Sequence, residues 1–154
     1  MPVYIHTKRV DTPKKRCTCF LLRKLARRVT QAYDRALAPA GLTITQFSLL
    51  ARLARGEATS VSALAARMGM DRTTLVRNLK PLEASGWVRY GERGAGKPAA
   101  PELSASGRAR LRAAAPLWER AQDDLEALLG PKRIAGLHAL VDESLDLLNA
   151  KDAV

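Results

Sequence analysis

The sequence predicts a mainly α-helical fold with one small β-hairpin. Alanine, leucine and arginine dominate it, and aromatic residues make up only 5%, a composition that favours helices. Apolar residues recur at helical spacing in six segments, whereas residues 87–92 suit a strand, followed by a turn at 93–98. With 154 residues, 47% of them hydrophobic, the chain can bury one sizeable core, so we expect a single domain over residues 1–154.

The N-terminal third is expected to hold two helices behind an extended arm at residues 1–13. The first helix is predicted over residues 14–38, where a Pro-Ala-Gly sequence ends it. Thr43 is the expected N-cap of a second helix, which runs to about Arg55. Gln46 stands at the position that completes a capping box with Thr43.

Residues 61–86 give the strongest indication of function, because they contain two apolar-periodic helices joined by a turn at Gly69. The side chains predicted to be buried are Val61, Leu64, Ala65 and Met68 on the first helix and Leu75, Leu79 and Leu82 on the second. The opposite face of the second helix carries Arg72, Thr73, Thr74, Arg77 and Lys80. This arrangement is typical of a helix-turn-helix whose second helix lies in the major groove of DNA.

The C-terminal third is expected to form two long helices. Ser104 is the predicted N-cap of a helix to about Leu129, and Gly130-Pro131 separates it from a last helix to about Ala150. Their apolar residues are Leu111, Ala114, Ala115, Trp118, Leu125, Leu128 and Leu129, then Ile134, Leu137, Leu140, Val141, Leu145 and Leu148. A single small winged-helix unit does not need so much amphipathic helix, whereas a homodimer does. A homodimer also has the two-fold symmetry of a two-fold DNA site. An intramolecular helical bundle is the alternative.

The charge of the chain is strongly asymmetric. The net charge is +11, with 22 Lys/Arg against 7 Asp/Glu in residues 1–112 and 4 against 8 in residues 113–154. One end therefore suits a polyanion, and double-stranded DNA is the expected partner. The alternative explanation of the total charge is an arginine-rich composition that follows from a GC-rich genome.

The sequence indicates no membrane partner. No apolar run approaches the roughly 20 residues that a membrane span requires, and the basic N-terminus lacks the apolar stretch of a signal peptide. We therefore expect a cytoplasmic protein whose two cysteines, Cys17 and Cys19, are reduced at rest.

Several motifs resemble, in their order and spacing, those of MarR-type winged helix-turn-helix regulators. The matching residues are Gly41-Leu42-Thr43-x-x-Gln46-Phe47, Val61-x-x-Leu64-Ala65, Asp71-Arg72-x-Thr74-x-x-Arg77, Leu82-Glu83-x-x-Gly86-Trp87-Val88 and Leu103-Ser104-x-x-Gly107. The resemblance covers about residues 17–150. It implies a DNA-binding lobe at 43–103, with its wing at 87–103, between dimerisation helices at 14–38 and 104–150. It also implies a homodimer, most often a repressor, that binds a palindromic operator and is released by a small molecule or a redox signal.

The residue types predict three kinds of DNA contact. Arginine can bond guanine bidentately and threonine can contact a thymine methyl group or a phosphate, so the groove-facing set is Arg72, Thr73, Thr74 and Arg77. Phosphate contacts, which give affinity and register, are expected from Arg67, Lys80 and Arg89. Minor-groove contacts at the tip of the wing are expected from Arg93 and Lys97.

Two features depart from the family pattern. Similar proteins carry an Asp that braces the arginine at the tip of the wing, whereas Ala95, Gly96 and Lys97 occupy that region here, so we expect no acidic brace at the tip. Pro81 lies in the second half of the predicted recognition helix and removes one backbone hydrogen bond. We expect a kink or local loosening near Arg77, without loss of the helix.

The segment Cys19-Phe20-Leu21-Leu22, with Arg27 and Tyr33, resembles the start of the organic-hydroperoxide-sensing branch of the family. In that branch a cysteine on the first helix is oxidised, and tyrosines hydrogen-bond its thiolate. Tyr33 matches one of these tyrosines, and Arg23 replaces the other. An arginine one turn from a thiol favours the reactive thiolate, so the candidate redox site is Cys17, Cys19, Arg23 and Tyr33. A direct Cys17–Cys19 disulfide would be strained, and inert packing at a dimer interface is the alternative to a redox role.

Other functional classes find less support. The sequence shows no nucleophile–base pair, no phosphate-cradling glycine loop and no carboxylate cluster, so we expect neither an enzyme nor a cofactor. His6 and His138 are isolated, and Cys17-x-Cys19 lacks the spacing of a structural zinc site, so no metal is expected. A winged-helix module that binds an acidic protein partner is the alternative to the DNA-binding regulator.

Overall fold

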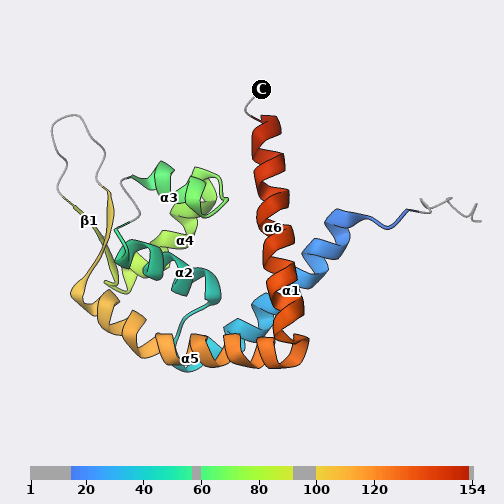
Figure 1. The fold of residues 1–154 in the computed structure, drawn as a ribbon. Coiled ribbons are helices and arrows are strands. Elements are labelled where there is room, and N and C mark those ends of the chain that lie inside the picture. Colours follow the sequence, from blue (N-terminus) through green and yellow to red (C-terminus); the bar gives the residue numbers. More distant parts are fainter. Residues whose placement is uncertain (1–14, 57–59, 92–99, 153–154) are drawn as a thin grey trace, which may run out of the picture.

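The computed structural model describes residues 15–56, 60–91 and 100–152, and these form a mainly helical fold with one two-stranded sheet (Figure 1). The elements are α1 (Thr18–Leu37), the 3-10 helix η1 (Ala38–Ala40), α2 (Ile44–Ala54), α3 (Val61–Arg67), α4 (Arg72–Ala84), β1 (Val88–Tyr90), β2 (Pro101–Leu103), α5 (Ala105–Leu129) and α6 (Pro131–Asp152). We call α2, α3, α4, β1 and β2 the lobe, and α1, the second half of α5 and α6 the arm. The predicted fold class is confirmed.

Helix α1 begins later than the sequence suggests. The prediction over residues 14–38 is wrong at its start, because the helix begins at Thr18 and Cys17 is its N-cap in an extended conformation. The Sγ atom of Cys17 accepts a hydrogen bond of 3.5 Å from the backbone NH of Phe20. Lys15 and Arg16 precede the cap, and cations there oppose the helix dipole, which explains the late start.

The predicted cap of α2 is confirmed. The hydroxyl of Thr43 accepts from the backbone NH of Gln46 at 3.3 Å, and the Gln46 side chain accepts from the backbone NH of Thr43 at 3.0 Å. These two bonds form a complete capping box. Ser60 and Ser104 cap α3 and α5 in the same way, each through its side-chain oxygen.

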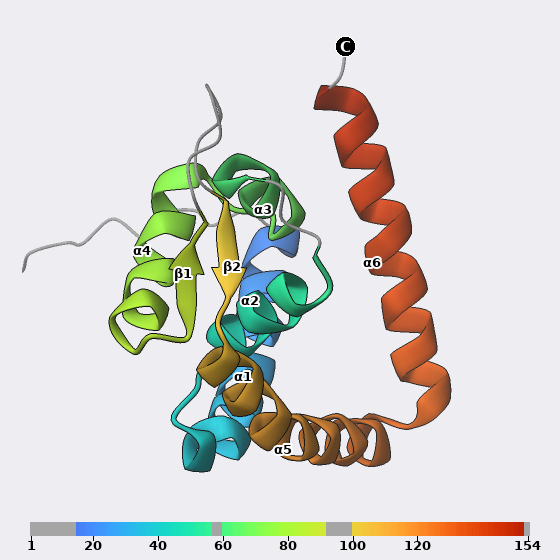
Figure 2. The ribbon, with the colours of Figure 1, turned by 90° about the vertical axis from the view of Figure 1, so that its left-hand side faces the viewer.

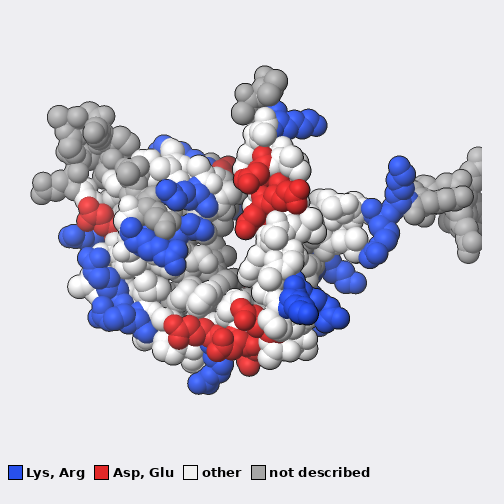
Figure 3. Space-filling model, viewed as in Figure 1, with Lys and Arg blue, Asp and Glu red and all other residues white. Residues whose placement is uncertain are grey.

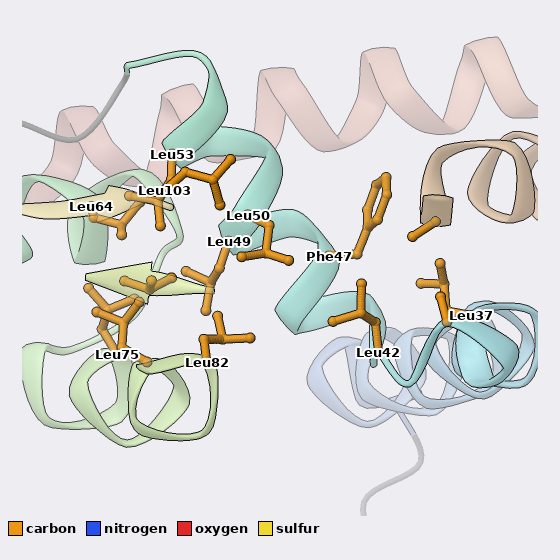
Figure 4. Packing of buried hydrophobic residues seen from close by; sticks show 14 of the residues in the cluster. Leu37, Leu42, Phe47, Leu49, Leu50, Leu53, Leu64, Leu75, Leu82 and Leu103 are labelled. Carbon is orange, nitrogen blue, oxygen red and sulfur yellow. The ribbon is translucent and has the colours of Figure 1, made fainter. Parts of the chain in front are cut away.

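The core of the lobe is built almost entirely of leucine. The side chains with no exposed surface come from α2, α3 and α4, and they are Leu49, Leu50, Leu64, Leu75, Leu79 and Leu82. Figure 4 shows the labelled members of this set, Leu49, Leu50, Leu64, Leu75 and Leu82, directed from the three helices toward one another. The buried face predicted for α4 is therefore confirmed, and its opposite face is left to solvent.

The wing is an antiparallel pair in which Val88 lies opposite Leu103, and Tyr90 opposite Pro101. The strand predicted at 87–92 is shorter, and its partner strand, which the sequence did not predict, begins at Pro101. Proline fits here because the strand lies at the edge of a sheet, where a missing NH costs little. Val88 and Leu103 are both buried, so one face of the hairpin closes the core.

Helix α5 joins the two halves of the molecule. Its first half packs on the lobe, where Trp118 stacks on Phe47 with ring centroids 5.7 Å apart, and Ala114 is fully buried. Ala114 and Trp118 thus pack in the core of the chain, although the sequence analysis lists them among the apolar residues that favour a homodimer. Its second half crosses α1.

Helix α6 leaves the end of α5 and runs beside the lobe without closing a bundle (Figures 1 and 2). On α6, Leu140, Leu147 and Leu148 are 61–67% exposed. On α5, Leu128 is 79% exposed. The intramolecular bundle is therefore not formed by the described residues. Among those residues, no helix is long and apolar enough to cross a membrane.

Candidate nucleic-acid interface

The turn between α3 and α4 brings the two helices into a helix-turn-helix. Gly69 adopts a left-handed conformation with φ of 60°, which glycine reaches without strain. The NH of Gly69 donates to the carbonyl of Ala66 at 3.0 Å, and that of Met70 donates to the carbonyl of Ala65 at 2.9 Å. This is a Schellman ending, and it stops α3 sharply enough for α4 to begin at Arg72.

The outer face of α4 presents a row of cations. Arg72, Thr73, Arg77 and Lys80 are exposed and, with the half-exposed Val76, line one shallow depression. Pro81 lies inside α4, and the helix nevertheless continues to Ala84, as the sequence analysis expects. Four of the predicted contact residues therefore lie together on one surface.

Thr74 differs from the other predicted groove residues. Its hydroxyl donates a 2.6 Å hydrogen bond to one carboxylate oxygen of Asp71, and its backbone NH donates to the other at 2.8 Å. These bonds lower the pKa of the Asp71 carboxyl below its usual value. The hydroxyl proton of Thr74 is thus engaged, which leaves its methyl group and lone pairs for contacts with DNA.

Asp71 has a structural role at this surface that the sequence motif alone did not reveal. It is the N-cap of α4, so it fixes the start of the helix that carries the cations. The signal was present, because Asp is a favoured N-cap residue and stands directly before an apolar-periodic run. Arg72 is held from the other side, since its Nη1 atom lies 3.5 Å from the hydroxyl of Ser62 on α3.

Arg89 projects from the wing and is paired with an acidic residue. Its guanidinium donates to the carboxylate of Glu102 on the opposite strand at 3.1 Å, and both side chains are about half exposed or more. The expected lack of an acidic brace concerns the tip of the wing, which lies outside the described residues. Glu102 faces Arg89 from directly across the hairpin, although the two residues are 13 positions apart in the sequence. Arg93 and Lys97 lie outside the described residues, and Arg67 lies on the last turn of α3.

The first turn of α5 anchors the base of the wing. The hydroxyls of Ser104 and Ser106 both donate to the carbonyl of Gly86, at 2.7 and 2.8 Å. Gly107 lies so close to the wing that a Cβ atom there would come within 2.1 Å of the carbonyl oxygen of Trp87. The wing and the start of α5 thus form one tightly packed unit.

The candidate redox residues are not brought together within one chain. Cys17 and Cys19 are both exposed at the start of α1, and Arg23 lies one turn after Cys19. Tyr33 lies 14 residues further along the same helix, about 21 Å away at 1.5 Å per residue. Tyr33 is buried, and its hydroxyl donates to the side-chain oxygen of Gln122 on α5. Burial and then the charge of Glu126 raise the pKa of Tyr33.

Basic and acidic side chains gather over different parts of the molecule. Figure 3 shows lysine and arginine side chains over the lobe and along α1, and acidic side chains along α5 and α6. No group of three or more potential metal ligands occurs among the described residues. The lobe thus offers a basic surface around an exposed helix, a geometry that suits a nucleic-acid backbone.

Comparisons with known proteins agree with this geometry. Residues 40–97 match the model of the MarR family. The chain is 42% identical to the transcriptional regulator MosR of M. tuberculosis, over 86% of this chain and 98% of that one, with a TM-score of 0.71. The chain belongs to the MarR family. Its relatives there are transcriptional regulators and not enzymes.

Two further structures of the family were solved with a partner. MosR in complex with DNA is 41% identical, over 86% of this MarR-family chain and 98% of that one, with a TM-score of 0.72. The transcriptional repressor CouR, bound to p-coumaroyl-CoA, is 29% identical, over 83% and 91% of the two chains, with a TM-score of 0.72. No curated protein matches the chain significantly.

Proposed function

We propose that this MarR-family protein is a transcriptional regulator, a repressor, that binds a palindromic DNA operator as a homodimer. The observation that carries the proposal is the outer face of α4, where Arg72, Thr73, Arg77 and Lys80 are exposed beside a paired wing. Such a face can reach base edges through its arginines and the backbone through its lysine. The solved complex of MosR with DNA supports the same class of partner.

The arm supports the homodimer. Leu140, Val141, Leu145 and Leu148 lie 41–62% exposed along α6, and Phe20 on α1 is 58% exposed. Large apolar side chains left exposed along a helix are typical of an interface. A second copy of the chain doubles the phosphate contacts and matches the two-fold symmetry of a palindrome.

The effector that releases the DNA is either an oxidant or a small molecule. Exposure of Cys17 and Cys19 in the single chain gives an oxidant access to both thiols. Inert packing of these cysteines requires a partner chain to cover them. CouR was solved with p-coumaroyl-CoA, which supports a small molecule as the alternative signal.

Selection of bound sequences from random double-stranded DNA tests the proposal. We expect one palindrome to be enriched, with affinity that falls steeply as salt rises because phosphate contacts release counterions. Arg77→Ala should weaken binding by about 1–3 kcal/mol and relax the preference at one position of each half-site. Arg120→Ala, on the exposed side of α5, is the matched control. Salt-sensitive binding without any enriched palindrome would instead favour an acidic protein partner.

Mild peroxide separates the two effectors. If oxidation is the signal, peroxide should release the wild-type protein from its selected DNA, and Cys19→Ser should prevent release. Release that persists in both Cys17→Ser and Cys19→Ser would remove the thiols from the mechanism. Binding that peroxide leaves unchanged in the wild type would leave a small molecule as the effector.

A further inference from the structure

The lobe and the arm are joined at two places, and Arg110 touches both. One junction is η1 with the following residues to Thr43, which connects α1 to α2. The other is α5 itself, which begins at the wing and continues without a break into the arm (Figure 2). The angle between lobe and arm is therefore set by how these two junctions are held relative to each other.

Arg110 projects from the second turn of α5 and bridges the two junctions. Its Nη1 atom donates a 3.0 Å hydrogen bond to the carbonyl of Ala40, the last residue of η1. Its guanidinium carbon lies 4.8 Å from the centroid of the Trp87 ring, within the range of a cation–π contact. Arg110 is partly buried, which strengthens both interactions relative to water.

Trp87 gives this contact a rigid base. The carbonyl of Trp87 accepts from the backbone NH of Ser104 at 3.0 Å. The same carbonyl oxygen lies so close to Gly107 that no side chain fits between them. A guanidinium stacked on Trp87 is therefore fixed to the wing and to α5 as one unit. The bond from Arg110 to Ala40 then restrains the other junction against that unit.

Asp34 restrains the same junction from the side of the arm. Its Oδ1 atom accepts a 2.7 Å hydrogen bond from the backbone NH of Ile44, the first residue of α2. Asp34 belongs to α1, so this bond reaches across η1 from the arm to the lobe. Between the two bonds lies Gly41, which has a left-handed conformation with φ of 65°.

We propose that Arg110 is a positioning residue that fixes the angle between lobe and arm, and thereby selects the spacing between the two half-sites of the operator. The inference rests on the proposed function, since only a DNA-bound homodimer has such a spacing. In a two-fold dimer the distance between the two recognition helices follows from how each lobe is held on the arm. A lobe free to rotate about η1 would accept several spacings at nearly equal cost.

The test measures affinity against spacing. The selected palindrome is prepared with its natural centre and with one or two base pairs inserted or removed, and binding to the full-length protein is followed by fluorescence anisotropy. For the wild type we expect a loss of about tenfold or more at a change of one base pair, because both lobes can no longer engage. For Arg110→Ala we expect a flattened profile, with less than about threefold between neighbouring spacings.

Three matched variants make the outcome specific. Arg112→Ala, at an exposed position two residues along α5, should keep the wild-type profile. Arg110→Lys should restore part of it, because lysine can still lie over Trp87 and donate to Ala40. Asp34→Ala should flatten the profile as Arg110→Ala does, and it serves as the second variant if Arg110→Ala does not fold.

The failures are distinguishable. If the wild type binds no palindrome, the proposed function fails. If the wild type shows a spacing preference and both folded variants retain its shape, this inference fails and the function stands. A uniform loss of affinity at every spacing would also overturn it, because general destabilisation lowers the whole profile without changing its shape.

Discussion

Asp71 shows how a single side chain prepares the surface beside it. Its carboxylate holds both the backbone NH and the hydroxyl of Thr74, so it starts α4 and also orients one of the residues predicted to face DNA. The cap places a negative charge beside Arg72, in a surface otherwise rich in cations. The local order of the recognition face thus depends on a residue that would itself repel phosphate.

We expect this cap to make the protein sensitive to acid. The pKa of Asp71 is lowered in the folded state by its bonds to Thr74, so the stabilisation is present above the ordinary aspartate value and is lost as pH falls through the lowered one. Denaturant midpoints should therefore decline below about pH 4. In Asp71→Asn, which can still cap the helix, the decline should be smaller. An equal decline in both proteins would show that other carboxylates cause it.

Gly107 is required for packing, and its replacement should be costly. A Cβ atom at this position would lie 2.1 Å from a backbone oxygen of Trp87 and 2.7 Å from Leu103. Gly107→Ala should therefore lower the free energy of unfolding by about 1–3 kcal/mol. Gly136→Ala, in α6 where a Cβ meets nothing within 4 Å, should raise it by about 0.5–1 kcal/mol. Urea unfolding of the two variants checks both signs.

At the scale of the element, the wing is defined by pairing across the hairpin. Arg89 is expected to contact phosphate, yet the structure pairs it with Glu102. Because the pair is largely exposed, it contributes little to stability. Its larger effect should be on DNA binding, since the carboxylate competes with phosphate for the same guanidinium.

Glu102→Gln should therefore tighten DNA binding several-fold while the free energy of unfolding changes by less than about 0.5 kcal/mol. Affinity for the selected operator, measured at two salt concentrations, checks this. The gain should be much smaller in the background Arg89→Ala, where there is no guanidinium to release. An equal gain in both backgrounds would mean that Glu102 acts only through its charge.

The helices followed from local signals, and the exceptions have physical causes. The caps at Thr43 and Ser104 and the periodicity of α4 are encoded within a few residues of each other, so sequence reasoning finds them. To predict where α1 begins, the unfavourable interaction of the preceding cations with the helix dipole has to be weighed against the helical periodicity. Strand β2 required knowing that Pro101 lies at an edge, which depends on the partner strand.

At the scale of the whole molecule, α6 is amphipathic but its apolar side is uncovered. Leu140, Val141 and Leu145 are exposed, while Asp142 and Asp146 fall on the opposite side at about 100° per residue. An unpartnered apolar face next to an acidic one provides a surface that a second copy of the chain can cover, with the acidic side left in water.

We expect Leu145→Glu to weaken dimerisation by about tenfold or more, because a charge would be buried at the interface. DNA affinity should fall with it, and helix content should not change, since Leu145 is 51% exposed in the single chain. Ala139→Glu, on the acidic side of α6, is the matched control and should remain dimeric. Sedimentation velocity over a range of concentrations decides; dimers of equal strength in both variants would place the interface elsewhere.

The sequence by itself determined the helix boundaries within a few residues, the buried leucines of the lobe and the cationic face of α4. These features are local, since each depends on spacing, capping and charge along one segment. Only the tertiary structure decided that Glu102 meets Arg89, that Tyr33 bonds Gln122 away from the cysteines, and that Arg110 bridges Trp87 and Ala40. Each of these contacts joins residues far apart in the chain, and no periodicity within one segment specifies which distant partner it will face.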